Sequence, residues 1–405
     1  MSDTYFRRGF GLKSEIEGQL AADYASSVVE AFRAHGNAIT VGPLTFRLAK
    51  EFGFCYGVDR AVDYAYETRA KFPDRRIFLV GEIIHNPHVN QKLAAMGIQF
   101  LAHEAGKSFD FSGITAEDVV ILPAFGVTIQ DFQRLRALGC VLVDTTCGSV
   151  LNVWKRVESY ARDGFTAVVH GKYYHEETKA TASQVEKYPG GKYLVLRDLA
   201  EARPVLDFIE GRGDAAALKA QFAHASSPDF DFAKDLERIG IANQTTMLAG
   251  ESLALAAEFR KSFAQRLGQE EAERRFRSFD TLCSATQERQ DAVLDLLTGG
   301  VDLMMVVGGY NSSNTCHLAA LAVSQGARAF HIEDADCIDT VQGTLRHQAV
   351  RAKTESVEGA GWLGGAKIIG LTAGASTPNN KVGETVLRIC EVAGLGEELA
   401  KALGD

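Results

Sequence analysis

Residues 140–162 read CVLVDTTCGSVLNVWKRVESYAR. The first five residues form a short apolar run that predicts a buried strand, and the polar turn TTCGS follows it. Residues 150–162 then predict a helix. This stretch is therefore expected to fold as a strand, a polar turn and a helix, with Cys147 in the turn.

The same order of strand, cysteine and helix occurs three times in the chain. A local pattern that recurs in this way indicates a repeated architecture. In the other two copies the cysteine again stands between a predicted strand and a predicted helix. These copies are residues 48–54, Cys55 and 59–69, and residues 279–282, Cys283 and 288–297.

Each predicted helix is followed by two further apolar strands, and each of these strands ends in a polar loop. Alternating strands and helices predict parallel sheets with functional groups at the carboxyl ends of the strands. The strands 77–80, 166–170 and 303–307 lead into His85-Asn86, His175-Glu176-Glu177 and Ser312-Ser313-Asn314. The strands 119–122, at Ile241 and 368–371 lead into Ala124-Phe125-Gly126, Gln244-Thr245-Thr246 and Gly374-Ala375-Ser376.

The expected fold class is therefore α/β, with three pseudo-repeated lobes that bring the cysteines and the polar loops to one centre. The expected boundaries are an amino-terminal extension at residues 1–45 and lobes at 46–146, 147–279 and 280–405. Residues 199–240 are acidic and rich in alanine, and we interpret them as a peripheral insertion in the second lobe.

Composition and charge exclude several classes of function. The 405 residues carry a formal charge of -9, which argues against a nucleic-acid partner because phosphate backbones are bound by clustered cations. The first forty residues contain no uninterrupted apolar run, so neither a signal peptide nor a transit peptide is expected. No segment reaches the roughly 20 apolar residues of a membrane span. Seven cysteines in such a chain indicate a reducing, cytoplasmic location.

Cys55, Cys147 and Cys283 share a predicted environment at the amino end of a helix. The positive end of the helix dipole lowers the pKa of a thiol there and favours the thiolate that binds metal. Cys316 follows a predicted helix start and is kept as a further candidate. The cysteines without this context, which are assigned to the core or to no role, are Cys140, Cys337 and Cys390.

Three converging thiolates favour an iron-sulfur cluster over zinc. Structural zinc prefers four ligands in closely spaced pairs, and the sequence contains no Cys-x-x-Cys. Iron-sulfur clusters normally take one cysteine per iron. Three cysteines for four irons leave one iron open to a substrate oxygen.

The loop residues predict a substrate that carries phosphate. Imidazole, hydroxyl and amide groups donate hydrogen bonds to phosphate, and nearby glycines let backbone amides approach closely. The sequence lacks a P-loop and a lysine cluster, so a nucleotide is not expected. The candidate phosphate ligands are His85, His175, Ser312, Asn314 and Ser376.

With these residues the sequence resembles the IspH/LytB family of 4-hydroxy-3-methylbut-2-enyl diphosphate reductases. The motifs that carry the resemblance occur in the family's order from about Phe46 to Lys381. They are GFCYGVDRA (53–61), EIIHN (82–86), DTTC (144–147), HEE (175–177), QTT (244–246), CSAT (283–286) with RQ (289–290), NSSN (311–314) and TAGAS (372–376).

The resemblance implies a role for each candidate residue. It implies that Glu177 supplies a proton to the substrate hydroxyl and that Thr245 forms a hydrogen bond near it. It implies that Cys55, Cys147 and Cys283 bind one 4Fe-4S cluster at the centre of a three-lobed trefoil. It implies that the diphosphate is bound by His85, His175, Ser312, Ser313, Asn314 and Ser376.

The implied reaction is the reductive dehydroxylation of 4-hydroxy-3-methylbut-2-enyl diphosphate. In this family two electrons arrive through the cluster, the C-O bond breaks as water leaves, and isopentenyl and dimethylallyl diphosphates form. This reaction is the last step of the methylerythritol phosphate route to isoprenoids.

The chain departs from the family pattern at one loop and at its amino terminus. Many members have a histidine in the loop where this chain has Phe125, so one diphosphate donor is missing. That phenylalanine and the first forty-odd residues, with FRRGFG at 6–11, are similar to the longer cyanobacterial and chloroplast branch. This similarity implies ferredoxin, or flavodoxin, as the electron donor.

Two other classes of function remain as alternatives. An iron-sulfur dehydratase also uses an open iron but removes water without net reduction, so it needs no external reductant. A non-catalytic zinc or iron-sulfur protein would use the polar loops only for structure.

Overall fold

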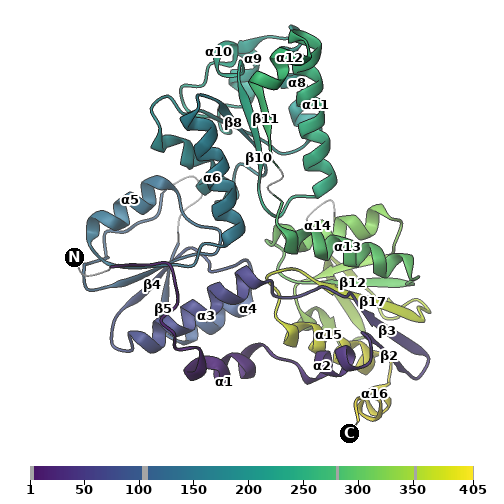
Figure 1. Ribbon diagram of the computed structural model, residues 1–405. Helices are drawn as coiled ribbons and strands as arrows, with labels where there is room; N and C mark the ends of the chain where they lie inside the picture. Colours follow the sequence, from purple (N-terminus) through teal and green to yellow (C-terminus); the bar gives the residue numbers. More distant parts are fainter. Residues whose placement is uncertain (1–3, 103–107, 280–281, 351–353, 405) are drawn as a thin grey trace. The chain divides into compact units, whose positions relative to one another are not determined.

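The computed structural model describes residues 4–102, 108–279, 282–350 and 354–404. The chain divides into two compact units, and each is described by itself (Figure 1). No helix in the described ranges combines the length and the apolar character that a membrane span requires. The first unit is Met1–Arg8, Asp74–Ile83 and Ile98–Cys283, and the second is Gly9–Pro73, Ile84–Gly97 and Ser284–Asp405.

The first unit contains a five-stranded parallel sheet in the order β1-β7-β6-β4-β5. Its three central strands are buried along their whole length, as apolar runs covered on both faces should be. Leu135 of α5 (Ile129–Leu138) packs into the core on one face. The strands are β1 (Tyr5–Phe6), β4 (Ile77–Val80), β5 (Ile98–Leu101), β6 (Val119–Leu122) and β7 (Val141–Asp144).

A four-stranded parallel sheet, β11-β10-β8-β9, completes the first unit. Alternation along β10 sends Ile239 and Ile241 into the core that includes α8 and α11 (Figure 1), whereas Ala242 packs with α6. A Cβ atom at Gly240 would lie 2.5 Å from the ring of Tyr160 on α6, so a glycine is required there. The strands are β8 (Thr166–His170), β9 (Tyr193–Leu196), β10 (Ile239–Asn243) and β11 (Phe276–Ser278). The helices are α6 (Gly148–Arg162), α7 (Glu176–Ser183), η1 (Gln184–Lys187), α8 (Leu199–Ile209), α9 (Ala215–Gln221), α10 (Phe232–Asp235), α11 (Ala249–Leu267) and α12 (Gln269–Arg275).

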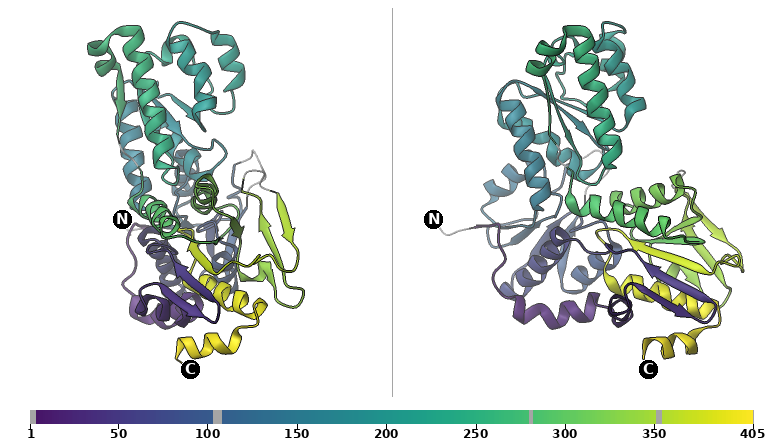
Figure 2. Two further views of the ribbon diagram at one scale, coloured as in Figure 1. Left: turned by 90° about the vertical axis from the view of Figure 1, so that its right-hand side faces the viewer. Right: turned by 45° about the vertical axis from the view of Figure 1, so that its right-hand side comes forward.

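The second unit is built on a mixed sheet in the order β14-β15-β13-β12-β17-β3-β2, with β16 paired to β15. Residues along β12 alternate between two cores: Met305 packs with α2 and α15, and Met304 packs with α13 and α14. Figures 1 and 2 show these helix pairs on opposite faces of the sheet. The strands are β2 (Ala38–Val41), β3 (Leu44–Leu48), β12 (Leu303–Val307), β13 (Ala329–Ile332), β14 (Ile338–Asp339), β15 (Thr344–Gln348), β16 (Glu355–Glu358) and β17 (Ile368–Ala373). The helices are α1 (Lys13–Tyr24), α2 (Ser27–Ala34), α3 (Tyr56–Lys71), α4 (Pro87–Ala95), α13 (Ser284–Thr298), α14 (Ser313–Ser324), η2 (Ala335–Cys337), α15 (Asn379–Val392) and α16 (Gly396–Leu403).

The three sheets share a core of three parallel strands, which is the repeat that the sequence predicted. The three cores are β4-β6-β7, β8-β10-β11 and β12-β17-β3. In each core the first two strands lead into the predicted polar loops, and the third leads into a cysteine. The cysteine strand therefore closes a repeat instead of opening one.

Because the cysteine strand closes each repeat, residues 46–73 do not belong to the lobe in which they were expected. We expected them in the first lobe, but β3 pairs with β17, and α3 belongs to the second unit. Residues 1–45 do not form a separate extension, because β1 joins the first sheet and β2 joins the third. The boundary expected at residue 280 lies outside the described residues.

Two other expectations need correction, those for residues 48–54 and for residues 199–240. The strand expected at 48–54 is β3, which ends at Leu48, and the strand expected at 279–282 includes residues that are not described, with β11 ending at Ser278. Residues 199–240 are not peripheral. Their apolar side chains, including Val205 and Phe222, are buried in the core that covers one face of the second sheet.

Candidate active site

Cys147 and Cys283 both lie in the first unit, each immediately before a helix. Cys147 is the N-cap residue of α6, and Cys283 precedes the first residue of α13. The hydroxyl of Ser149 donates a hydrogen bond to Sγ of Cys283 at 3.3 Å. Because Ser149 is two residues from Cys147, this bond brings two of the predicted cluster cysteines to the same place.

The pKa of the Cys147 thiol is raised, whereas the sequence predicted that the helix dipole would lower it. Burial raises this pKa, and the neighbouring Cys283 raises it further, whereas hydrogen bonds from the amides of Ser149 and Val150 lower it. The helix start therefore acts in the expected direction but is outweighed by burial. A cation bound at the sulfur would offset both the burial and the repulsion, because metal coordination deprotonates a thiol.

Cys55, the third predicted cluster cysteine, lies in the second unit as the N-cap residue of α3. Its amide donates to the carbonyl of Ala375 at 3.2 Å. The buried guanidinium of Arg289 donates to the carbonyls of Gly53 at 2.7 Å and Phe54 at 3.1 Å. Arg289 thus fixes the turn before Cys55, a role that the sequence did not reveal although the residue stands in a motif. The sequence did offer one signal for this role, which is the presence of an arginine in a motif within a predicted helix. If such an arginine is buried, its guanidinium needs hydrogen-bond acceptors.

The surroundings of the remaining four cysteines are those of residues with a structural role. The half-buried Cys316 is in the first turn of α14, and its Sγ donates to the carbonyl of Tyr310 at 3.3 Å. The cysteines that were assigned to the core or to no role are all buried in apolar surroundings: Cys140, Cys337 and Cys390.

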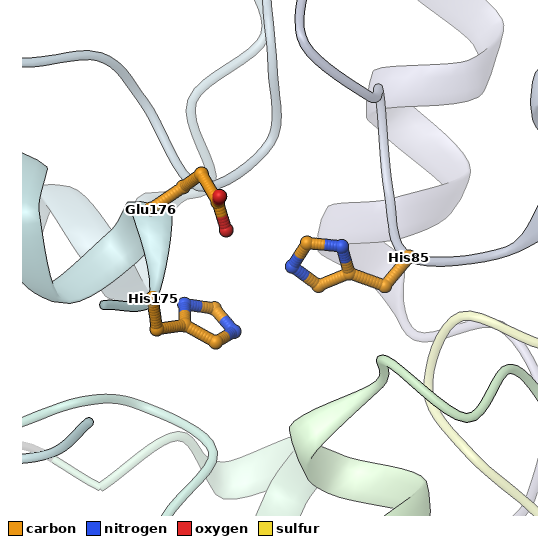
Figure 3. Close-up of side chains that lie close together, drawn as sticks. All are labelled: His85, His175 and Glu176. Carbon is orange, nitrogen blue, oxygen red and sulfur yellow. The ribbon is translucent and has the colours of Figure 1, made fainter. Parts of the chain in front are cut away.

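His175 caps the amino terminus of α7. Its Nδ1 atom accepts a hydrogen bond from the amide of Glu177 at 3.2 Å, so a neutral ring carries its proton on Nε2. Figure 3 shows the side chains of His175 and Glu176 leaving this end of the helix. The cap thus fixes His175 as a hydrogen-bond donor through Nε2, as a phosphate ligand requires.

Glu177 is buried at 3% exposure, and its Oε1 accepts a hydrogen bond from the amide of Thr245 at 2.6 Å. The side chain of Gln244 joins the same two loops, since its Oε1 accepts from the amide of Lys172 and from the hydroxyl of Thr178. The structure therefore places the two predicted catalytic residues in direct contact.

Phe125 stands next to this pair of loops. Its ring meets the ring of His175 edge to face, with centroids 6.3 Å apart and an interplanar angle of 75°. The carbonyl of the preceding residue, Ala124, accepts from the amide of Cys147 at 2.8 Å. The ring of Phe125 thus packs against the ring of His175, and a phenylalanine side chain has no hydrogen-bond donor.

In the second unit, three separate segments meet at the amino terminus of α14. Ser312 caps the helix by accepting from the amide of Thr315. The hydroxyl of Ser376 lies 3.3 Å from that of Ser312 and 3.4 Å from the carbonyl of His85. His85 is half-buried in the turn before α4 (Figure 3). The polar loops expected after three different strands therefore come together in this unit.

Asn314 provides a donor at this helix start. Its Oδ1 accepts from the amide of Ala375 at 2.8 Å, which fixes the orientation of the side chain. Its Nδ2 is buried and has no hydrogen-bond partner among the described residues. The neighbouring Ser313 is also buried, at 3% exposure. An amide held in place without an acceptor, at the positive end of a helix dipole, is suited to an anion.

Two glycines make this close approach of segments possible. A Cβ atom at Gly374 would lie 1.9 Å from Oγ1 of Thr315, and one at Gly309 would lie 2.6 Å from the carbonyl oxygen of His85. Any other residue at either position would push the loops apart.

Comparisons with known proteins agree with this arrangement. A family model described as LytB protein matches residues 46–390. The 4-hydroxy-3-methylbut-2-enyl diphosphate reductase of Gloeobacter violaceus is 47% identical over 98% of this chain and 94% of its own length. The reductase of the same name from Thermosynechococcus vestitus is 47% identical over 96% of this chain and 94% of its own.

Two solved structures share the fold. The E-1-hydroxy-2-methyl-but-2-enyl-4-diphosphate reductase of Plasmodium falciparum superposes with a TM-score of 0.63 at 20% identity, over 85% of this chain and 87% of its own. A structure of (E)-4-hydroxy-3-methyl-but-2-enyl diphosphate reductase gives a TM-score of 0.52 at 26% identity, over 85% of this chain and 99% of its own. The chain therefore belongs to the LytB protein family, the family of the 4-hydroxy-3-methylbut-2-enyl diphosphate reductases.

Proposed function

We propose that this chain reduces 4-hydroxy-3-methylbut-2-enyl diphosphate to isopentenyl and dimethylallyl diphosphates, the terminal step of the methylerythritol phosphate pathway. It is an oxidoreductase of the family to which it belongs. The main structural support for this proposal is the contact of Glu177 with Thr245. It pairs a buried acid with the second residue that was predicted to be catalytic.

The family implies an iron-sulfur cofactor, and the cysteines fit one. Cys147 and Cys283 are brought together by Ser149, and Cys55 has the same position at a helix start. We assign these three thiols as the ligands of one 4Fe-4S cluster. When bound, such a cluster supplies electrons one at a time and an open iron that acts as a Lewis acid.

The start of α14 is proposed as the principal diphosphate site. The buried Nδ2 of Asn314 donates one hydrogen bond, and the hydroxyls of Ser312 and Ser376 donate others. The positive end of the α14 dipole stabilises the negative charge. We assign His85, His175 and Ser313 to the same ligand. The Nε2 proton of His175 follows from the hydrogen bond at its Nδ1.

Glu177 is proposed as the proton donor to the leaving hydroxyl. Its Oε1 accepts the amide of Thr245, so the proton that it transfers is held on Oε2. The hydroxyl of Thr245 then forms a hydrogen bond near the substrate hydroxyl. Glu177 is held in the first turn of α7 and Thr245 in the loop after β10, so the substrate meets a preformed pair.

Electron donor and location are also proposals. The similarity to the longer cyanobacterial branch supports ferredoxin, or flavodoxin, as the donor. The cysteine content supports a cytoplasmic location.

The reaction is tested by an anaerobic assay with the diphosphate alcohol as substrate. We expect both C5 diphosphate products when dithionite and a viologen dye supply electrons, and no product when the reductant is left out. Loss of water from the substrate without a reductant would instead identify an iron-sulfur dehydratase. No reaction with or without the reductant, from protein that contains iron, would contradict the proposal.

A substitution at Asn314 tests the diphosphate site. Asn314→Asp keeps the oxygen that accepts from Ala375 but replaces the Nδ2 donor with a second, negatively charged oxygen. We expect KM to rise about ten- to a hundred-fold or more, since a hydrogen bond to a charged group contributes about 1.5 to 3 kcal/mol. Asn152→Asp, at an exposed position of α6, makes the same change in charge and should leave KM unchanged. An unchanged KM in Asn314→Asp would place the diphosphate elsewhere.

A further inference from the structure

The amino-terminal strand β1 is an added edge of the first sheet, next to the strand that leads to Cys147. Tyr5 and Phe6 pair in parallel with Leu142 and Val143 of β7. The carbonyl of Thr4 accepts from the amide of Leu142 at 2.6 Å. This pairing sets Tyr5 near the end of β7, where the turn toward Cys147 begins.

The Tyr5 side chain reaches that turn through a buried carboxylate. Its hydroxyl donates to Oδ2 of Asp144 at 2.5 Å. Oδ1 of Asp144 accepts the amide of Thr146 at 2.9 Å and the hydroxyl of Thr146 at 2.5 Å. Thr146 is directly followed by Cys147, whose own amide donates to the carbonyl of Ala124. One carboxylate thus joins the amino-terminal strand to the residue before the cysteine.

The surroundings hold Tyr5 in its place. Its ring meets Phe132 edge to face at 5.4 Å between centroids, and the guanidinium of Arg136 lies over the ring at 5.7 Å. The Asp144 side chain is only 7% exposed, and Arg7 approaches it from the solvent side at 3.9 Å. A buried carboxylate needs donors, and Tyr5 is one of the few groups that supply them here.

We propose that β1 is a positioning element for Cys147, in which Tyr5 fixes the Asp144 carboxylate and thereby the 144–147 turn. This inference rests on the proposed role of Cys147 as a cluster ligand. Tyr5 touches neither the cysteine nor the substrate, so it is a positioning residue and not a catalytic one. It keeps the thiol aimed at the cluster and thereby slows the loss of iron.

The test is the rate of iron release from anaerobic holoenzyme to a chelator. Tyr5→Phe keeps the ring and removes only the hydroxyl. We expect iron release to speed up about ten- to a hundred-fold, the range that corresponds to one lost hydrogen bond to a charged group. Tyr66→Phe is the matched control, because Tyr66 donates a comparable bond to Asp23 in the second unit. It should release iron at the wild-type rate.

A double variant shows whether Tyr5 acts through Asp144. In an Asp144→Asn background the further change Tyr5→Phe should add little, because the acceptor that links Tyr5 to the turn has already been altered. Fully additive effects would overturn the proposed link.

Hydrogen exchange of metal-free protein gives a readout that needs no cluster. In Tyr5→Phe the amides of residues 144–147 should exchange faster, while those of the second sheet keep the wild-type rate. Wild-type iron release in Tyr5→Phe, from a wild-type enzyme that does bind iron, would overturn this inference and leave the proposed function intact. A wild-type enzyme without iron would instead overturn the proposed function.

Discussion

Cys147→Ser should abolish the cluster in a protein that otherwise binds about four irons per chain, the content of one 4Fe-4S cluster. A serine oxygen is a poor substitute for the soft thiolate that iron-sulfur clusters require. The same loss is expected for Cys55→Ser and Cys283→Ser, because each of the three occupies the start of a helix. Iron and sulfide analysis of anaerobically purified protein, with the absorption of the brown chromophore, measures the effect.

Cys337→Ser is the matched control. Cys337 is buried at 2% exposure in the apolar core of the second unit, and a serine there keeps a partner in the hydroxyl of Tyr310. We expect this variant to retain the iron content of the wild type. Full iron content in Cys147→Ser would refute the ligand assignment, and one zinc in a colourless wild type would favour a structural metal site.

The strands were the part of the fold that sequence reasoning predicted best. The runs at 77–80, 119–122, 166–170 and 303–307 match β4, β6, β8 and β12 without a shift. These strands are buried on both faces, so they appear in the sequence as uninterrupted apolar segments between polar turns.

The phase of the repeat was not predictable in the same way. A strand that precedes a cysteine can pair with the strands before it or with those after it, and a periodic sequence fits both choices. β3 pairs with β17, more than 300 residues later in the chain, so nothing close to it in sequence signals the partner. The acidic, alanine-rich composition of residues 199–240 indicated a peripheral insertion, but composition does not show that Val205 and Phe222 lie in the core.

The sequence predicted which residues form the candidate site, but it did not predict the contacts that hold them in place. Helix starts at Cys55 and Cys147 were visible because strand, turn and helix follow one another locally. The bonds that fix those turns join residues far apart, Arg289 to Gly53 and Tyr5 to Asp144, and only the fold brings these pairs together.

Glu177→Gln should reduce turnover about a hundred- to ten-thousand-fold, the usual contribution of a general acid. The structure makes this substitution a clean test. Glu177 is buried, and the oxygen that accepts the amide of Thr245 is retained by glutamine. The loop should therefore keep its shape, while the other side-chain atom can no longer release a proton. Steady-state kinetics with a chemical reductant gives kcat, and iron content and KM should change much less than kcat.

Glu176→Gln separates this chemical effect from a general effect of replacing a carboxyl with an amide at the same helix start. Glu176 and Glu177 are the first two residues of α7, so the two variants make the same change at neighbouring positions. Only Glu177 is held by Thr245, and only its variant should lose turnover. If Glu177→Gln kept more than about a tenth of wild-type turnover, against an expected loss of at least a hundred-fold, the proton would have to come from the diphosphate or from a bound water.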